Sequence, residues 1–311
     1  MARPRSRLDE THEILNSKPH PPPPTPKRKQ NQLSLKTRNQ IQHFIKFIYQ
    51  TFPNARSFFM KKVFTFSVLT AFSLFLMTSL APALFAGERV NLWPDGKTPN
   101  FEAHQTVPTY EICVPENKTS DSCVIVFPGG AYQGCCDQHE GVQIANFFNE
   151  KGITAVIVRY RVSRPKLVSK HVTAWQDAQR AVRTIRSKAA ELGINPEKIG
   201  CTGFSAGGHL TLMTSTSSQT PAYPAIDELD NVPCHVNFAI PVYPAYVLED
   251  GNNGPNKGKG NDSKMVADFA FDAKTPPMCF IHGDLDVYSP MGSVAVYHKL
   301  RTMNIPAEIH I

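Results

Sequence analysis

The segment IGCTGFSAGGHL, residues 199–210, decides which fold this sequence predicts. It opens with a short apolar run, residues 199–203, of the length and composition of a buried strand. A helix is predicted to follow. Between strand and helix, Gly203, Ser205 and Gly207 form a Gly-x-Ser-x-Gly sequence, called the serine turn below. Such a turn needs small neighbours because the serine backbone is strained and adjacent strands crowd it.

Short apolar runs alternate with amphipathic helical patterns on both sides of this segment. Further strands are predicted over residues 123–127, 154–158, 238–242, 278–282 and 307–311. Helices are predicted over residues 139–151, 174–192, 206–216 and 291–303. Alternation of this regularity is typical of a mostly parallel sheet covered by helices on both faces. Residues 249–262 are rich in Gly, Asn and Lys and predict a mobile surface loop.

The composition is that of a globular protein, with 311 residues of which 41% are hydrophobic and 19% charged. This length can bury a sizeable core, which excludes a disulfide-stapled miniprotein and a mostly disordered chain. The net charge of +7 is uneven, because residues 1–62 carry 13 Lys and Arg against 3 Asp and Glu. The rest carries 20 basic and 23 acidic residues, so no nucleic-acid partner is predicted.

Three segments are predicted along the chain. Residues 1–59 form a basic leader, rich in Pro, Gln, Asn and Ser, that cannot bury enough surface to fold alone. Residues 60–86 have the Met-Lys-Lys start, the apolar stretch and the small-residue end of a secretory signal peptide, so translation is expected to begin at Met60. A signal anchor is the alternative, because the 24 uncharged residues 63–86 can also span a bilayer. Either reading places the folded domain, residues 87–311, outside the cytoplasm, secreted or periplasmic, with membrane contact only through an uncleaved anchor.

A serine between a strand and a helix in such a turn is typical of a catalytic nucleophile. The pattern alone is weak, since about one chain in ten of this length has one by chance, and an ordinary serine in a glycine-rich turn is the alternative. A serine nucleophile also needs backbone N–H groups close to the acyl oxygen. The sequence PGGAY, residues 128–132, follows the first buried strand and is called the glycine loop below. Gly130 and Ala131, joined by Ala206, are the predicted oxyanion donors, and a plain turn is the alternative.

The acid of a catalytic triad is expected after a later strand. The sequence HGDLD, residues 282–286, ends the strand predicted at 278–282 and offers two carboxylates, Asp284 and Asp286. The residues alone leave both open.

Together these motifs resemble the α/β-hydrolases of the carbohydrate-esterase and lipase/esterase type, which include acetylxylan and feruloyl esterase-like members. Beside the nucleophile elbow formed by the serine turn, the matching stretches are PGGAY (128–132), HEG (139–141), VRYR (158–161), DAQRA (177–181), TPP (275–277), HG (282–283) and PAEIH (306–310). The resemblance covers about residues 89–311 and implies the α/β-hydrolase fold.

The resemblance also implies the chemistry. It implies an exported serine esterase that acts on acyl groups of a plant-type polysaccharide such as xylan, or on small esters, without a cofactor. The family spacing places the acid four residues after His282. That implies Asp286, with Asp284 as the alternative. Pro128 stands where the family's glycine loop usually has a histidine.

One departure from the family concerns the general base. The resemblance implies a histidine on a Gly-rich loop after the final strand, but the sequence stops within that strand at Ile311. We therefore expect a hydrolase truncated at its C-terminus, with the last strand and the base loop cut short and activity low or absent. His310 is the nearest substitute, because His209, His282 and His298 fall on or beside other predicted elements.

The seven cysteines all lie after residue 86, and their odd number precludes complete pairing within the chain. Cys201 and Cys279 lie in apolar runs and are predicted to be buried. Cys113 and Cys123 flank a turn-rich segment and could pair across neighbouring strands. No Cys-x-x-Cys occurs, so no metal site is predicted.

Two other functions remain open. A prolyl-type serine peptidase shares the serine turn, but residues 87–120 leave no room for the large domain that usually precedes its hydrolase unit. A non-catalytic carbohydrate-binding relative would use exposed aromatic side chains, for which Trp93 and Tyr132 are the candidates. For the esterase, the predicted partner is a small ester or an acylated carbohydrate.

Overall fold

The computed structural model describes residues 87–162, 168–249 and 264–311. The predicted leader, the signal segment and most of the predicted loop at 249–262 lie outside the described residues. Within the described ranges, none of the helices has the length and apolar character needed to cross a membrane.

Eight strands form one sheet. They are β1 (Arg89–Asn91), β2 (Thr109–Cys113), β3 (Cys123–Phe127), β4 (Thr154–Arg159), β5 (Ile199–Phe204), β6 (Phe238–Val242), β7 (Met278–Ile281) and β8 (Ala307–His310). Their order is β1-β2-β4-β3-β5-β6-β7-β8. β1 and β2 are antiparallel to their neighbours and every other pair is parallel. Every residue of β3 and β5 is buried, which explains why both strands read as continuous apolar runs.

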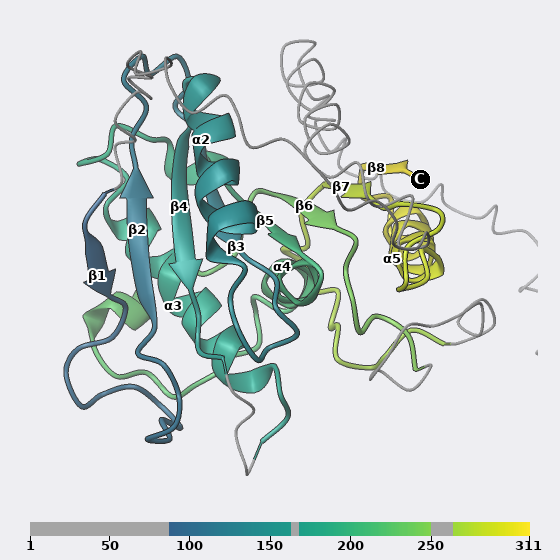
Figure 1. Cartoon of the computed structure of the whole chain (residues 1–311), viewed down its shortest axis with the longest axis horizontal. Helices are drawn as coiled ribbons and strands as arrows, with labels where there is room; N and C mark the ends of the chain where they lie inside the picture. Colours follow the sequence, from purple (N-terminus) through teal and green to yellow (C-terminus); the bar gives the residue numbers. More distant parts are fainter. Residues whose placement is uncertain (1–86, 163–167, 250–263) are drawn as a thin grey trace, which may run out of the picture. The chain divides into compact units, whose positions relative to one another are not determined.

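The helices are α2 (Gln143–Glu150), α3 (Val172–Ser187), α4 (Ala206–Thr216) and α5 (Met291–Thr302). A π-helical turn, η2 (Asp137–Val142), leads into α2, and 3₁₀ turns lie at η3 (Pro196–Lys198) and η4 (Glu228–Asn231). The connection β3–α2–β4 runs toward β2, whereas β4–α3–β5 runs back past β3. Because such crossovers are right-handed, α2 covers one face of the sheet and α3, α4 and α5 cover the other. Figure 1 shows α2 in front of the sheet and α3 behind it.

The connections after β3 and β5 run in opposite directions along the sheet, and this change of direction marks where a site is expected. The chain leaves β3 toward one side of the sheet and leaves β5 toward the other, and these strands are adjacent. In open α/β sheets, ligands bind in the crevice outside the carboxyl ends of strands at such a switch point. The glycine loop and the serine turn follow β3 and β5 and therefore both lie at this crevice.

Most predicted elements are confirmed. The predicted strands and the helices over 206–216 and 291–303 agree with the structure to within a residue at each end. Two predictions differ: the helix expected over 139–151 begins with the π-helical turn, and α3 ends at Ser187 rather than at 192. Beyond Ser187 the backbone forms a tighter turn than an α-helix, because the Ala189 N–H donates to the Arg186 carbonyl three residues back. Ala189 remains buried, so the apolar pattern continues past the end of the helix.

The cysteine prediction is wrong in one respect. All seven cysteines are free, and β4 lies between the strands that carry Cys113 and Cys123. Ala155 of β4 is paired with Cys113 on one side and with Val124 on the other, so the two thiols are not on neighbouring strands. The predicted burial of Cys201 and Cys279 is confirmed.

Candidate active site

Ser205 occupies the turn between β5 and α4, as predicted, with a backbone φ of 53° and ψ of −113°. This is a strained conformation for a residue with a side chain. Close packing requires the flanking glycines, since a Cβ on Gly203 would strike the Gly207 carbonyl and one on Gly207 would strike the Phe127 carbonyl. The Ser205 N–H donates to the Val242 carbonyl at 3.1 Å. Its side-chain hydroxyl has no hydrogen-bond partner among the described residues, so it is available for chemistry.

The glycine loop reaches the serine turn from β3. The loop backbone has φ of 135° at Gly130, 57° at Ala131 and 57° at Tyr132, so two consecutive residues with side chains are held in the left-handed region. Within the described part of the chain, the N–H groups of Gly130, Ala131 and Ala206 donate to no acceptor. The Ala206 N–H is also one of the unpaired groups at the first turn of α4. Three unoccupied amide donors at one crevice can bind an oxyanion.

Of the two candidate carboxylates, Asp286 is the better held. Its Oδ1 accepts the Tyr288 N–H at 2.9 Å, and its own N–H donates to the Gly283 carbonyl at 3.1 Å. Asp286 is half-buried, whereas Asp284 is exposed and makes no hydrogen bond to another described residue. A fixed carboxylate suits a residue that orients a base, so the geometry favours Asp286 over Asp284.

His282 is buried and lies between β7 and this carboxylate loop. Its Nδ1 is 2.8 Å from the Ser293 hydroxyl and its Nε2 is 3.1 Å from the Tyr288 carbonyl. Burial lowers the pKa of His282, and the charge of Asp286 opposes that shift. Both ring nitrogens are therefore occupied, one by α5 and the other by the loop that carries Asp286.

His209 lies one turn of α4 beyond Ser205 and is buried. Its Nδ1 is 2.8 Å from the Tyr132 hydroxyl, so a histidine of α4 contacts the glycine loop. Burial lowers the pKa of His209 well below its usual value, with smaller contributions from His171 and Lys170. Across the described ranges, no histidine hydrogen-bonds to Ser205 or to Asp286, and the base is not identified by contact.

The structure also groups His171, His209 and Asp268, whose ligand-type atoms lie within 4.8 Å of one another. No motif in the sequence pointed to this cluster, because its members come from separate segments. Two imidazoles and a carboxylate could bind a transition metal. However, Lys170 places its ammonium 3.2 Å from the Tyr246 ring centroid beside the cluster, and His171 lies at the N-terminal, positive end of α3. These positive charges oppose a cation, and we assign none.

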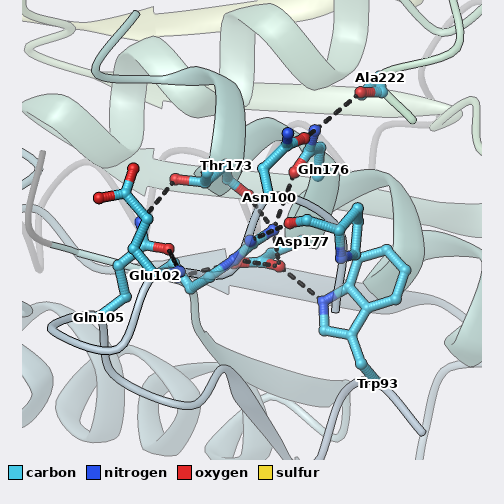
Figure 2. A network of polar contacts seen from close by, with 10 residues as sticks. Trp93, Asn100, Glu102, Gln105, Thr173, Gln176, Asp177 and Ala222 are labelled. Atoms are coloured by element: carbon cyan, nitrogen blue, oxygen red, sulfur yellow. Dashed lines mark hydrogen bonds and ion pairs between the residues drawn. The ribbon is translucent and has the colours of Figure 1, made fainter. Parts of the chain in front are cut away.

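The candidate sugar-binding aromatics are not exposed, which corrects the sequence prediction. Trp93 is 4% exposed and Tyr132 is 1% exposed. Figure 2 shows the Trp93 ring directed at Asp177, to whose Oδ1 the indole N–H donates at 2.7 Å. The non-catalytic carbohydrate-binding alternative therefore loses the residues on which it depended.

Several of the motifs that carried the resemblance have a structural explanation. The Arg161 side chain, at the end of β4, forms a fully buried ion pair with Asp177 of α3 at 2.9 Å. The Tyr160 hydroxyl donates to the Pro128 carbonyl at the start of the glycine loop. Thus VRYR and DAQRA fix the end of β4 against α3 and against the start of the glycine loop.

Comparison with known proteins now adds to this geometry. The BD-FAE family model matches residues 110–268, just over half of the 311 residues. The chain belongs to the BD-FAE family. The matched range contains the glycine loop and the serine turn, and it ends before Asp286.

Curated relatives agree with this assignment. An acetylxylan esterase of Xylanibacter ruminicola is 28% identical over 202 residues, covering 60% of this chain and 38% of that protein. An arylesterase of Saccharolobus solfataricus is 28% identical over 198 residues, covering 63% of this chain and 58% of that protein. The chain thus spans well under two thirds of the length of both relatives.

Among solved structures, the acetyl ester-xyloside bifunctional hydrolase of Caldicellulosiruptor lactoaceticus matches with a TM-score of 0.61 and 27% identity. The match covers 74% of this BD-FAE chain and 87% of that one. An esterase of Thermogutta terrifontis matches with a TM-score of 0.56 and 24% identity, which supports the fold. The predicted family and the α/β-hydrolase fold are confirmed, and the predicted enzyme class, carboxylic ester hydrolase, is that of these relatives.

Proposed function

We propose that this BD-FAE chain is an exported serine esterase that removes acyl groups, acetyl above all, from a xylan-type polysaccharide or from small esters. The names of the Xylanibacter and Caldicellulosiruptor proteins support an acetylated xylan or xyloside as substrate class. No metal or cofactor takes part in the proposed reaction.

One observation carries this proposal. Ser205 is held at φ 53°, and neither its hydroxyl nor the N–H groups of Gly130, Ala131 and Ala206 beside it have a partner among the described residues. A structural serine would need neither the strained backbone nor unpaired amides around it. The arrangement is the one that acyl transfer through a serine requires.

The proposed reaction proceeds in two halves. The Ser205 Oγ attacks the ester carbonyl carbon while a base takes its proton, and the N–H groups of Gly130, Ala131 and Ala206 bind the resulting oxyanion. Collapse of the tetrahedral intermediate breaks the bond to the alcohol, which leaves with the proton. Water, deprotonated by the same base, then attacks the acyl-serine and releases the carboxylic acid.

The base is proposed to be a histidine oriented by Asp286. His282 is unsuited, because its two ring nitrogens contact Ser293 and Tyr288. His209 is unsuited, because its Nδ1 contacts Tyr132 and burial lowers its pKa well below the usual value. His310 lies on β8, with its Nε2 3.7 Å from the Glu308 carboxylate. We propose that the base takes the family position on a loop after β8.

The test measures hydrolysis of p-nitrophenyl acetate and acetate release from acetylated xylan. A fluorophosphonate, which loses fluoride when a serine oxygen attacks its phosphorus, reports Ser205 by mass spectrometry even when turnover is slow. In a chain that carries the loop after β8, Ser205→Ala should abolish labelling and turnover, and Asp286→Asn should lower kcat about 10⁴-fold. Asp284→Asn is the matched control and should leave both rates near the wild-type value. Labelling elsewhere, or ester hydrolysis that survives Ser205→Ala, would refute the proposal.

The proposal of export rests on the sequence of residues 60–86 alone. N-terminal sequencing of protein recovered outside the cytoplasm should find a chain that begins near residue 84 or 87. Recovery of an intact chain in the membrane fraction would instead support a signal anchor.

A further inference from the structure

Glu140 joins the glycine loop to the segment that follows β6. It lies on η2, the π-helical turn after the loop, and it is half-buried. Its Oε2 accepts the Gly129 N–H at 2.7 Å, and its Oε1 accepts the Tyr243 hydroxyl at 2.8 Å. Each carboxylate oxygen thus holds a different segment of the crevice.

The first bond fixes the glycine loop. Besides its N–H bond to Glu140, Gly129 accepts the Cys136 N–H on its carbonyl at 2.9 Å. The Glu140 N–H donates to the Cys136 carbonyl at 2.9 Å. The backbone N–H and carbonyl of Gly129 are therefore both tied to the turn that carries Glu140. The next two amides along the chain are those of Gly130 and Ala131, so their direction depends on this anchor.

The second bond reaches the backbone that supports the nucleophile. Tyr243 directly follows Val242, whose carbonyl accepts the Ser205 N–H at 3.1 Å. The Tyr243 backbone has a φ of 33°, its N–H donates to the Ile281 carbonyl at 2.7 Å, and its ring packs against Phe204. The hydroxyl that bonds to Glu140 therefore comes from a residue fixed on three sides.

We infer that Glu140 is a positioning residue, whose carboxylate sets the oxyanion donors of the glycine loop at their distance from Ser205. The inference rests on the proposed function. Glu140 would not touch substrate. An ionised acceptor makes shorter and stronger hydrogen bonds than a neutral one, which suits a loop held in left-handed backbone at two consecutive residues. Oxyanion donors act chiefly in the transition state, so their displacement should lower kcat and leave KM nearly unchanged.

Three variants, made in a chain that carries the loop after β8, separate positioning from charge. Glu140→Ala removes both bonds and should lower kcat and the maximal rate of fluorophosphonate labelling by about ten- to a hundredfold, less than outright loss of an oxyanion donor. Glu140→Gln keeps an oxygen for the Gly129 N–H and an N–H for the Tyr243 oxygen, so it should retain kcat within about fivefold. Tyr243→Phe removes one bond and should fall between them.

Glu150→Ala is the matched control, because Glu150 is exposed at the end of α2 and its replacement should leave the rates nearly unchanged. The endpoint of labelling gives the fraction of competent enzyme, so slower chemistry is distinguished from partial unfolding. Normal kcat in Glu140→Ala, a change confined to KM, or equal losses in Glu140→Ala and Glu140→Gln would each overturn the inference. If wild-type Ser205 is not labelled at all, the proposed function fails and the inference with it. Labelled Ser205 with unchanged rates in Glu140→Ala overturns the inference alone.

Discussion

Asp177 and Glu140 are two carboxylates that each anchor backbone amides, but they do so in different surroundings. Asp177 is fully buried and accepts the Arg161 N–H at 2.8 Å, the Arg161 guanidinium and the Trp93 indole. Glu140 is half-buried and accepts two neutral donors, with no ion pair to a described residue. The Asp177 charge is neutralised by the Arg161 guanidinium, whereas the Glu140 charge is held only by hydrogen bonds.

The surroundings of each carboxylate determine what it contributes. A buried pair is costly to break because the remaining partner is left charged and unsolvated, so Asp177 contributes to the integrity of the fold. A carboxylate held by a hydroxyl and an amide can be replaced by an amide of the same shape at little cost. The difference therefore predicts large stability effects at Asp177, and at Glu140 an effect on rate with only a small one on stability.

The largest expected effect is that of Asp177→Ala, which leaves the Arg161 guanidinium buried without its anion and the Trp93 N–H unpaired. We expect the free energy of unfolding to fall by about 3–5 kcal/mol. Urea denaturation followed by far-UV circular dichroism measures it. Asp121→Ala is the control, since Asp121 pairs with Lys198 at 2.8 Å on the surface and should cost at most about 1 kcal/mol. Similar losses of unfolding free energy in both variants would show that the buried ion pair is no more important to stability than the surface pair.

An intermediate effect is expected for Tyr132→Phe. The variant keeps the buried ring, which lies 6.0 Å from that of Tyr160, but it leaves the His209 Nδ1 without its partner at 2.8 Å. An unsatisfied buried polar atom costs about 1–3 kcal/mol, less than a broken ion pair. The same denaturation curve measures the loss. Tyr297→Phe should change stability by less than about 0.5 kcal/mol, because the Tyr297 hydroxyl bonds to no described residue. Equal behaviour of both tyrosine variants would show that the contact with His209 is not stabilising.

The positions of the parallel strands along the chain and the serine turn could be predicted from the sequence, because both depend on local patterns. Buried parallel strands are continuous apolar runs, and the glycines around Ser205 are required by close backbone contacts. The antiparallel strands β1 and β2 were not predicted. They lie at one edge of the sheet, where β1 is exposed throughout, so no continuous apolar run marks them.

The candidate site was predictable only in part, for a similar reason. Gly130 and Ser205 lie in short motifs, whereas Glu140 and Tyr243 are distant in sequence and meet only because β3 and β6 flank β5. The HEG motif contained Glu140 without indicating its partner. The burial of Trp93 was missed because an aromatic residue outside a predicted strand or helix gives no periodic signal, while its partner Asp177 lies on a distant helix.

The smallest expected effect concerns pH and the charge that Glu140 retains. Burial raises the pKa of Glu140, and the bonds from Tyr243 and Gly129 oppose the shift. The folded protein therefore binds this proton more tightly than the unfolded chain does. The corresponding stability is fully present below the pKa of the unfolded chain and is lost as pH rises through the folded pKa.

Glu140→Gln cannot titrate at this position, so its stability relative to wild type should increase as pH rises through that interval and then level off. Denaturant unfolding of both chains between about pH 4 and pH 7 measures the difference. If the free energy of unfolding changes with pH in the same way in both chains, the Glu140 carboxylate is not destabilised by burial. A difference of opposite sign would show that its hydrogen bonds outweigh burial, and Glu140 would then resemble Asp177 in stabilising the fold through its charge.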